Sequence, residues 1–331
     1  MAEPSVLELA AHAKVNLALA VTGRRADGYH ELRSVFLRLE LADTLTVSPL
    51  ASVSSDLDPA APDRLVTQGD PDCPVADNLV LRAAVAFRAV AAAERGVDVP
   101  GVDISLTKRI PMSAGLAGGS TDAASMLRLL AARHPGVFTR AEMGALAARV
   151  GADVPFFVDG AGAALVRGRG ELIEPLPPPI DPVGVLLCTP PVGASTPMVF
   201  RAWDEQPAGG RANDATGQAV ADLAHLFRAG VDPGALADHA TSLREANDLW
   251  LPAAAVTPGL AALRDSLEQR LERPVLLTGS GSTLFALYAS GEATDLIARR
   301  LRSEPAFVTS RIIATRSTGL HVPTITSRRD P

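Results

Sequence analysis

The stretch KRIPMSAGLAGGSTDAA, residues 108–124, decides how the fold is interpreted. It follows a short strand pattern and leads into a helical pattern. Gly115, Gly118 and Gly119 let the backbone turn tightly and approach a ligand with no Cβ in the way. Backbone N–H groups at the start of the helix, together with the helix dipole, attract an anion. The segment 111–122 is therefore interpreted as an anion-binding loop, although a purely structural turn would use the same glycines.

Side chains around this loop support the anion-binding interpretation. Ser120 and Thr121 offer hydroxyl donors or metal ligands, and Lys108 and Arg109 bring positive charge. The loop is not a Walker loop, because no Gly-Lys-Ser/Thr ends it, and it lacks the GxGxxG of dinucleotide-binding sites.

The second informative stretch is AKVNLALAVTGRRADGYHEL, residues 13–32. Its alternation predicts a strand, on which Lys14 and Asn16 project from the same face. Either these polar residues belong to a site or Lys14 lies at the solvent edge. Tyr29 and His30 follow a predicted turn and offer a stacking plane and a hydrogen-bonding edge suited to a nucleobase. An ordinary loop aromatic is the alternative.

Two further segments carry candidate chemistry. Asp153 stands in VGADVP, residues 150–155, among apolar residues, where a carboxylate is either a turn cap or a positioned base. LTGSGSTLFAL, residues 277–287, predicts two strands around a Gly/Ser loop, for which a tight hairpin is the alternative.

Periodicity along the chain predicts an α+β fold, because strands and helices mix without a regular βαβ repeat. Expected strands are 15–21, 32–40, 44–47, 103–106, 183–188, 275–277, 284–287 and 307–313. Expected helices are 79–90, 123–133, 139–150 with a Thr139/Glu142 capping box, 257–271 opened by Thr257 and Pro258, and 292–302.

Composition predicts where the chain folds irregularly. Residues 48–76 are expected to form a surface excursion, 205–220 a mobile insertion, and the last ~14 residues a frayed end. A proline run after residue 174 predicts a junction between a domain of residues 1–174 and one of residues 175–331.

Bulk properties exclude several classes of protein. The 331 residues carry a net charge of −6, which provides no field for nucleic acid or an anionic membrane. Cys73 and Cys188 are the two cysteines, too few for a disulfide framework, and no CxxC or Cys/His spacing suggests a zinc site. The first residues lack the basic region of a signal peptide, and no apolar run has the length of a membrane span. We therefore expect a cytoplasmic protein.

Taken together and in this order, the Lys-x-Asn strand, the Gly-Leu-x-Gly-Gly-Ser loop and the late Thr-Gly-Ser-Gly loop resemble the GHMP kinase superfamily. The segments TGRRADGYHEL, DNLVLRAA and GADVPFF narrow the resemblance to kinases acting on 4-diphosphocytidyl-2-C-methyl-D-erythritol in non-mevalonate isoprenoid biosynthesis. The resemblance covers residues 10 to about 290. It implies a two-domain α+β fold, with a ribosomal protein S5 domain 2-like N-terminal domain that binds ATP and a ferredoxin-like C-terminal domain that contributes to the substrate pocket.

The resemblance also implies roles for individual residues. Asp153 matches the base, and Lys14 matches the lysine that polarises the C2 hydroxyl receiving the phosphoryl group of ATP. Residues matched to substrate binding are Asn16, Tyr29, His30, Thr196, Pro197, Phe200, Gly279 and Ser280. Residues matched to ATP binding are Asn78, Lys108, Pro111, Met112, Ser113, Ala114, Gly115, Leu116, Ala117, Gly118, Gly119, Ser120 and Thr121.

Departures and alternatives accompany this match. Ala117 stands where many relatives have glycine and Ala114 where some have another, and alanine disfavours positive φ. Mg²⁺ is expected beside ATP, with Ser120 and Thr121 as candidate ligands and no acidic ligand identified. The expected partner is a small molecule carrying a cytidine diphosphate group, and the chain is expected to be a monomer or a weak homodimer. Two alternative functions stay open for the chain. One is a homoserine- or mevalonate-type GHMP kinase, and the other is a non-catalytic ligand sensor on the same fold.

Overall fold

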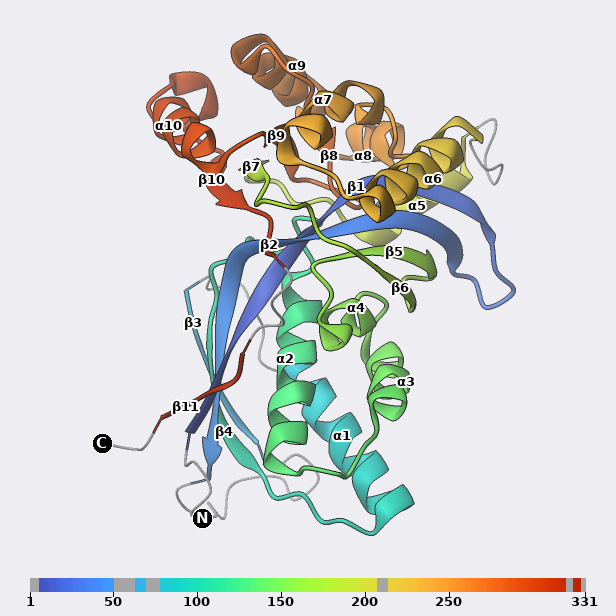
Figure 1. Ribbon diagram of the computed structural model, residues 1–331, viewed down its shortest axis with the longest axis vertical. Helices are drawn as coiled ribbons and strands as arrows, with labels where there is room; N and C mark the ends of the chain where they lie inside the picture. Colours follow the sequence, from blue (N-terminus) through green and yellow to red (C-terminus); the bar gives the residue numbers. More distant parts are fainter. Residues whose placement is uncertain (1–5, 51–62, 70–77, 207–213, 320–323, 329–331) are drawn as a thin grey trace.

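The computed structural model describes residues 6–50, 63–69, 78–206, 214–319 and 324–328. Within these residues the chain forms two β-sheets with helices packed against each (Figure 1). Both sheets are needed to understand the site, because β1 (Val6–Arg24) of the first sheet also contacts α6 (Asp214–Ala229), a helix that lies in sequence between two strands of the second sheet.

The first sheet is built on two long antiparallel strands, β1 and β2. Its order is β11-β1-β2-β4-β3, with β5 and β6 branching from β2. The first half of β2 pairs with β5 and its second half with β4, so one strand supports both branches. The strands are β1 Val6–Arg24, β2 His30–Pro49, β3 Arg64–Gln68, β4 Val102–Thr107, β5 Ala163–Gly168, β6 Leu172–Leu176 and β11 Thr326–Arg328.

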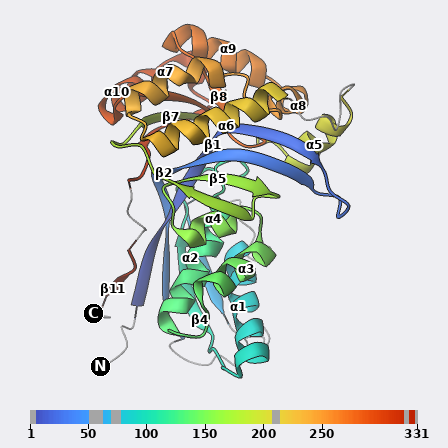
Figure 2. The ribbon, with the colours of Figure 1, turned by 45° about the vertical axis from the view of Figure 1, so that its right-hand side comes forward.

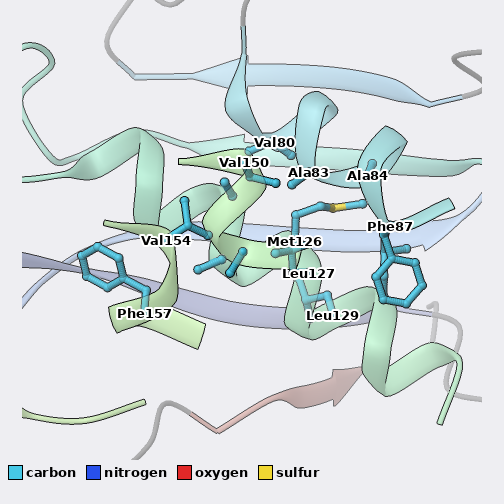
Figure 3. Close-up of a cluster of buried hydrophobic side chains, with 14 of the residues drawn as sticks. Val80, Ala83, Ala84, Phe87, Met126, Leu127, Leu129, Val150, Val154 and Phe157 are labelled. Atoms are coloured by element: carbon cyan, nitrogen blue, oxygen red, sulfur yellow. The ribbon is translucent and has the colours of Figure 1, made fainter. Parts of the chain in front are cut away.

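Four helices pack together beside this sheet: α1 Leu79–Arg95, α2 Gly118–Arg133, α3 Arg140–Val150 and α4 Val154–Asp159. Figure 3 shows side chains from α1, α2 and α4 meeting in their shared core, among them Phe87, Met126 and Phe157. Burial of these apolar side chains stabilises the arrangement by roughly 1.5–3 kcal/mol each. The predicted Thr139/Glu142 capping box begins α3.

The second sheet has the order β10-β7-β9-β8, with every neighbouring pair antiparallel. Its strands are β7 Gly184–Thr189, β8 Leu276–Leu277, β9 Leu284–Tyr288 and β10 Arg311–Arg316. Its helices are α5 Thr196–Asp204, α6 Asp214–Ala229, α7 Pro233–Leu243, α8 Trp250–Val256, α9 Leu260–Leu271 and α10 Gly291–Arg302, followed by the 3₁₀ turn Pro305–Phe307. Figure 2 shows α6 running along β1, which it contacts.

The α+β class is confirmed, and most predicted elements form. The strand over 15–21 is present but buried on both faces, because α6 covers β1 and β2. The chain passes from the first sheet to the second between β6 and β7, close to residue 175. The domain limits stay a prediction, and β11 returns to pair with β1 of the first sheet.

Two regions predicted to be irregular contain regular structure. Residues 64–68, within the expected surface excursion, form β3, which pairs in parallel with β4 at the sheet edge. This strand is only five residues long and its neighbours in the sequence are polar, so the alternation of apolar and polar residues does not indicate it. Residues 214–220, within the expected mobile insertion, form the first turns of α6, whose Val220 is fully buried. The rest of both predictions lies largely outside the described residues, as does Cys73.

Two predicted boundaries are also wrong, as is the prediction of a frayed end over residues 326–328, while residues 320–323 and 329–331 lie outside the described part of the chain. Thr257 ends α8 rather than opening a helix, and α9 begins at Leu260 after Gly259 takes a left-handed conformation. The final strand of the second sheet starts at Arg311 instead of residue 307. Near the end of the chain, β11 is fixed by pairing with β1, which no local sequence pattern indicates.

Candidate active site

A cavity of about 1010 Å³ lies where β1, the loop before α2, the start of α4, helix α5 and the β8–β9 loop meet. All the residues predicted for the site line this cavity except Leu116 and Thr121. The fold therefore brings segments that are far apart in the sequence together around one cavity. Leu116 and Thr121 are buried behind it, where the Leu116 carbonyl accepts a hydrogen bond from the Lys14 N–H.

Lys14 is held at the floor of the cavity with its ammonium fully engaged. Its Nζ donates to Asn16 Oδ1 at 2.6 Å and to the Gly115 carbonyl at 3.0 Å. Asp153 Oδ2 lies 3.7 Å from the same nitrogen. Burial lowers the pKa of Lys14, while the charge of Asp153 acts in the opposite direction. The solvent-edge alternative for Lys14 is therefore wrong, since the residue is 3% exposed.

Asp153 precedes α4, but its side chain makes no capping hydrogen bond to the helix. The carboxylate instead faces the cavity and keeps 28% of its side-chain surface exposed. A base needs a free oxygen within reach of the proton that it accepts. Asp153 meets that need, and the turn-cap alternative has no support in the structure.

Asn16 and Thr278 join the two glycine-rich loops. The Asn16 backbone N–H donates to Thr278 Oγ1 at 3.1 Å, and Thr278 Oγ1 donates to the Gly115 carbonyl at 3.2 Å. Asn16 Nδ2 also donates to Ser34 Oγ at 2.9 Å. The late loop is thus part of the site rather than a simple hairpin, because it fixes the position of the first loop.

The loop before α2 depends on unusual backbone conformations. Gly115 has φ of +75°, and a Cβ there would lie 2.3 Å from the Thr278 carbonyl oxygen. Ala117 also has a positive φ, +57°, immediately before α2. An L-residue in this region costs about 1–2 kcal/mol. The departure from glycine at Ala117 therefore places strain in the loop, whereas Ala114 has no positive φ.

The start of α2 presents Gly118, Gly119 and Ser120 to the cavity. The first N–H groups of a helix have no intrahelical partner and attract anions. Asn78, on another part of the wall, caps α1 by accepting a hydrogen bond from the Val80 N–H at 3.0 Å. The wall near α1 and α2 is therefore suited to a phosphorylated nucleotide.

A buried charged cluster of Lys108, Asp43 and Asp122 adjoins this wall, and Lys108 and Asp122 themselves line the cavity. Lys108 Nζ donates to Asp122 Oδ2 at 2.6 Å and also to an Asp43 carboxylate oxygen. Asp122 Oδ1 has no hydrogen-bond partner among the described residues. Burial raises the pKa of Asp122 to about 8, against the opposing charge of Lys108. Lys108 therefore gives little free positive charge to the loop.

The opposite end of the cavity carries the aromatic residues. The rings of His30 and Phe200 stack with centroids 4.6 Å apart and planes 18° apart. Tyr29 is 56% exposed, and the Arg169 guanidinium lies 5.0 Å from the centre of its ring. Thr196 Oγ1 and Ser280 Oγ, which also line the cavity, are hydrogen bonded at 2.8 Å.

Several residues of the wall were missed by the sequence interpretation. Arg24 and Asp204 pair at 3.5 Å, and Asp204 also contacts His30. Asp204 follows Phe200 by four residues on α5, so helical spacing pointed to it. Arg169 lies between β5 and β6 and had no sequence signal.

A magnesium ion fits this wall only as a companion of bound phosphates. No group of three or more His, Cys, Asp or Glu side chains able to hold a metal occurs within the described residues. Magnesium commonly binds one or two protein oxygens together with substrate phosphates and waters. Ser120 and Asp153 line the cavity and carry suitable oxygens, whereas Thr121 does not line it.

No helix in the described part of the chain is long and apolar enough to cross a membrane.

Sequence comparisons relate the whole chain to known kinases. Residues 78–161 match the GHMP kinases N terminal domain, and residues 226–306 match the GHMP kinases C terminal domain. A 4-diphosphocytidyl-2-C-methyl-D-erythritol kinase of Moorella thermoacetica is 37% identical over 90% of this chain and 95% of its own length. The enzyme of the same name from an Anaeromyxobacter species is 36% identical over 98% and 96%.

Solved structures show the same architecture. A crystal structure of 4-(cytidine 5′-diphospho)-2C-methyl-D-erythritol kinase superposes with a TM-score of 0.68 at 35% identity, covering 94% of this chain and 100% of that one. A homoserine kinase from Cytophaga hutchinsonii superposes with a TM-score of 0.67 at 16% identity, covering 98% of each chain. The second likeness, at so low an identity, concerns the fold alone.

Proposed function

The chain belongs to the 4-diphosphocytidyl-2-C-methyl-D-erythritol kinase family of the GHMP kinases, and we propose that it transfers the γ-phosphoryl group of ATP to the C2 hydroxyl of that substrate. It is a phosphotransferase with an alcohol acceptor, as the names of its relatives state for them. The products are ADP and the 2-phosphate. The reaction serves non-mevalonate isoprenoid precursor synthesis.

The observation that carries this proposal is the Lys14–Asp153 pair at the floor of a cavity built from both glycine-rich loops. Phosphoryl transfer requires positioning and charge stabilisation more than covalent chemistry. In the proposed mechanism the C2 hydroxyl lies against Asp153, which accepts its proton as the oxygen attacks the γ-phosphorus. Such a base contributes typically about 10²–10⁴-fold to the rate.

Lys14 supports this step through charge. Its ammonium is fixed by Asn16 and the Gly115 carbonyl, so it stays in place without reorganising. A preorganised positive charge in a buried site stabilises the negative charge that develops on the attacking oxygen. Asn16 orients both Lys14 and the substrate.

ATP binds along the other wall in this proposal. The N–H groups at Gly118, Gly119 and Ser120 bind the phosphates, and Asn78 lies towards the adenosine. Ser120 would help to hold magnesium together with the phosphates, and the ion would supply neutralising charge there. The cytosine binds at the aromatic end, between Tyr29 and Phe200 and beside His30.

Two alternatives are weaker. A homoserine- or mevalonate-type kinase has no use for an exposed tyrosine and a stacked His–Phe pair at one end of its cavity. A non-catalytic sensor has no use for a buried lysine poised against a free carboxylate. Neither alternative explains both ends of the cavity.

The test is an assay of ADP release with ATP and three acceptors offered in parallel: 4-diphosphocytidyl-2-C-methyl-D-erythritol, homoserine and mevalonate. We expect ADP release only with the first. Turnover of homoserine or mevalonate at a higher kcat/KM would support the second kinase class, and no turnover of any acceptor would support the sensor.

A further inference from the structure

His30 has one ring nitrogen committed to a carboxylate. Its Nε2 lies 2.8 Å from Asp204 Oδ1. The other oxygen of Asp204 lies 3.5 Å from the Arg24 guanidinium. Asp204 therefore connects a cation on one side to the imidazole on the other.

The imidazole is also restrained by its neighbours on α5. Phe200 stacks on one ring face at 4.6 Å, and the Trp203 ring meets it edge-on at 5.3 Å. Phe200, Trp203 and Asp204 lie three and four residues apart, so one face of α5 holds the ring. The His30 side chain is only 9% exposed, and its orientation is thus determined by packing as well as by the hydrogen bond.

This contact has a consequence for the tautomer. An ionised carboxylate can only accept hydrogen bonds, so the nitrogen facing it carries the proton. In a neutral imidazole the second nitrogen is then a bare acceptor. For His30 that nitrogen is Nδ1, which has no hydrogen-bond partner within the described part of the chain, while the residue lines the cavity beside Tyr29.

We propose that Asp204 is a positioning residue that holds His30 as its Nε2–H tautomer, so that the bare Nδ1 selects pyrimidines with a 4-amino group over those with a 4-oxo group. A 4-amino group donates a hydrogen bond to Nδ1. A 4-oxo group presents a lone pair to a lone pair and leaves both acceptors unsatisfied. Unsatisfied buried polar groups cost enough to produce about a 10- to 100-fold preference.

The inference rests on the proposed function for its substrate, and it adds the element that distinguishes cytosine from uracil. Asp204→Asn is the decisive variant, because an amide can either accept from or donate to Nε2. The carboxamide permits both tautomers, and the 4-oxo substrate then finds an N–H at Nδ1. Glu205→Gln is the matched control, since Glu205 is the next residue, contacts Arg201 and is exposed.

The experiment compares kcat/KM for the cytidine substrate and for its uridine analogue in the three proteins. We expect the wild-type chain and Glu205→Gln to favour the cytidine substrate by about 10- to 100-fold, and Asp204→Asn to lose most of that preference through a higher KM for cytidine and a lower one for uridine. An Asp204→Asn variant that weakens both substrates equally would overturn the inference, because that is the effect of a merely structural residue.

Two further readouts keep the inference separate from the proposed function and from misfolding. Calorimetric titration with cytidine 5′-diphosphate and uridine 5′-diphosphate measures the same preference without turnover. If the wild-type chain binds cytidine 5′-diphosphate selectively but phosphorylates no methylerythritol substrate, the proposed function fails and the inference stands. ¹⁵N spectra of the wild-type imidazoles, with the His30 signal assigned from His30→Gln, report the tautomer directly. A protonated Nδ1 and bare Nε2 would overturn the inference even if Asp204→Asn failed to fold.

Discussion

Lys14 Nζ and Asp153 Oδ2 lie 3.7 Å apart at the floor of the cavity, close enough for an ion pair and too far for a strong hydrogen bond. The lysine is buried, whereas the carboxylate keeps part of its surface open to the cavity. This asymmetry suits a base and its supporting cation, because the carboxylate oxygen has to meet a substrate proton while the ammonium has to stay in place.

Asp153→Asn is expected to lower kcat by about 10²–10⁴-fold while leaving both KM values nearly unchanged. The amide keeps the shape of the side chain but does not accept the proton. Steady-state kinetics with the cytidine substrate measure the effect. Asp159→Asn, at the other end of α4, is the control and should be near wild type. Turnover of Asp153→Asn close to wild type would show that the base lies elsewhere.

Tyr29→Ala is expected to raise the KM for the cytidine substrate by about 10-fold, through loss of base stacking. The KM for ATP should not change, because Tyr29 lies at the aromatic end of the cavity. The side chain is 56% exposed, so folding should be unaffected. Tyr29→Phe keeps the stacking plane and serves as control. An unchanged substrate KM in Tyr29→Ala would contradict the stacking role.

Much of the site was predictable because its residues leave local signatures. Glycine at position 115 reflects a positive φ, which disfavours a Cβ, and a close backbone contact, which excludes one. Lys14 and Asn16 share a strand face, which spacing alone reveals. The family predicted from these signatures is confirmed by relatives of 36–37% identity over most of the chain.

Contacts between distant segments were not predictable in the same way. Asp43 pairs with Lys108 across two strands, and nothing near Asp43 in the sequence marks it. The pairing of β11 with β1 depends on where the fold carries the end of the chain. Such contacts depend on tertiary packing, which local periodicity does not encode.

Gly115→Ala is expected to destabilise the chain and to raise the KM for ATP. The new Cβ would meet the Thr278 carbonyl at 2.3 Å, so the phosphate-binding loop has to shift. Gly136→Ala is a matched control with φ of +83° and no atom within 4 Å of the new Cβ. It should lose only the about 1–2 kcal/mol of left-handed strain. Equal losses in both variants, measured by urea unfolding, would contradict the close contact.

The Asp122 carboxyl gives a prediction about pH. Its pKa is raised by burial from 3.8 to about 8 in the folded chain. Between these values the folded chain holds a proton that the unfolded chain has released, so stability falls as pH rises. The contribution is fully present below about pH 4 and is lost as pH approaches 8.

Asp122→Asn is therefore expected to flatten the pH dependence of the melting temperature between pH 5 and about 8. The amide resembles the protonated, neutral carboxyl but does not titrate at any pH. Lys108 keeps Asp43 as its partner. One kcal/mol moves the melting temperature of a chain this size by about 1–2 °C, which thermal melts resolve. Asp238→Asn, an exposed carboxylate, should melt with the wild-type pH dependence. If Asp122→Asn kept that dependence as well, Asp122 would be ionised throughout the range, and the cluster beneath the loop would carry a net negative charge that bound ATP has to overcome.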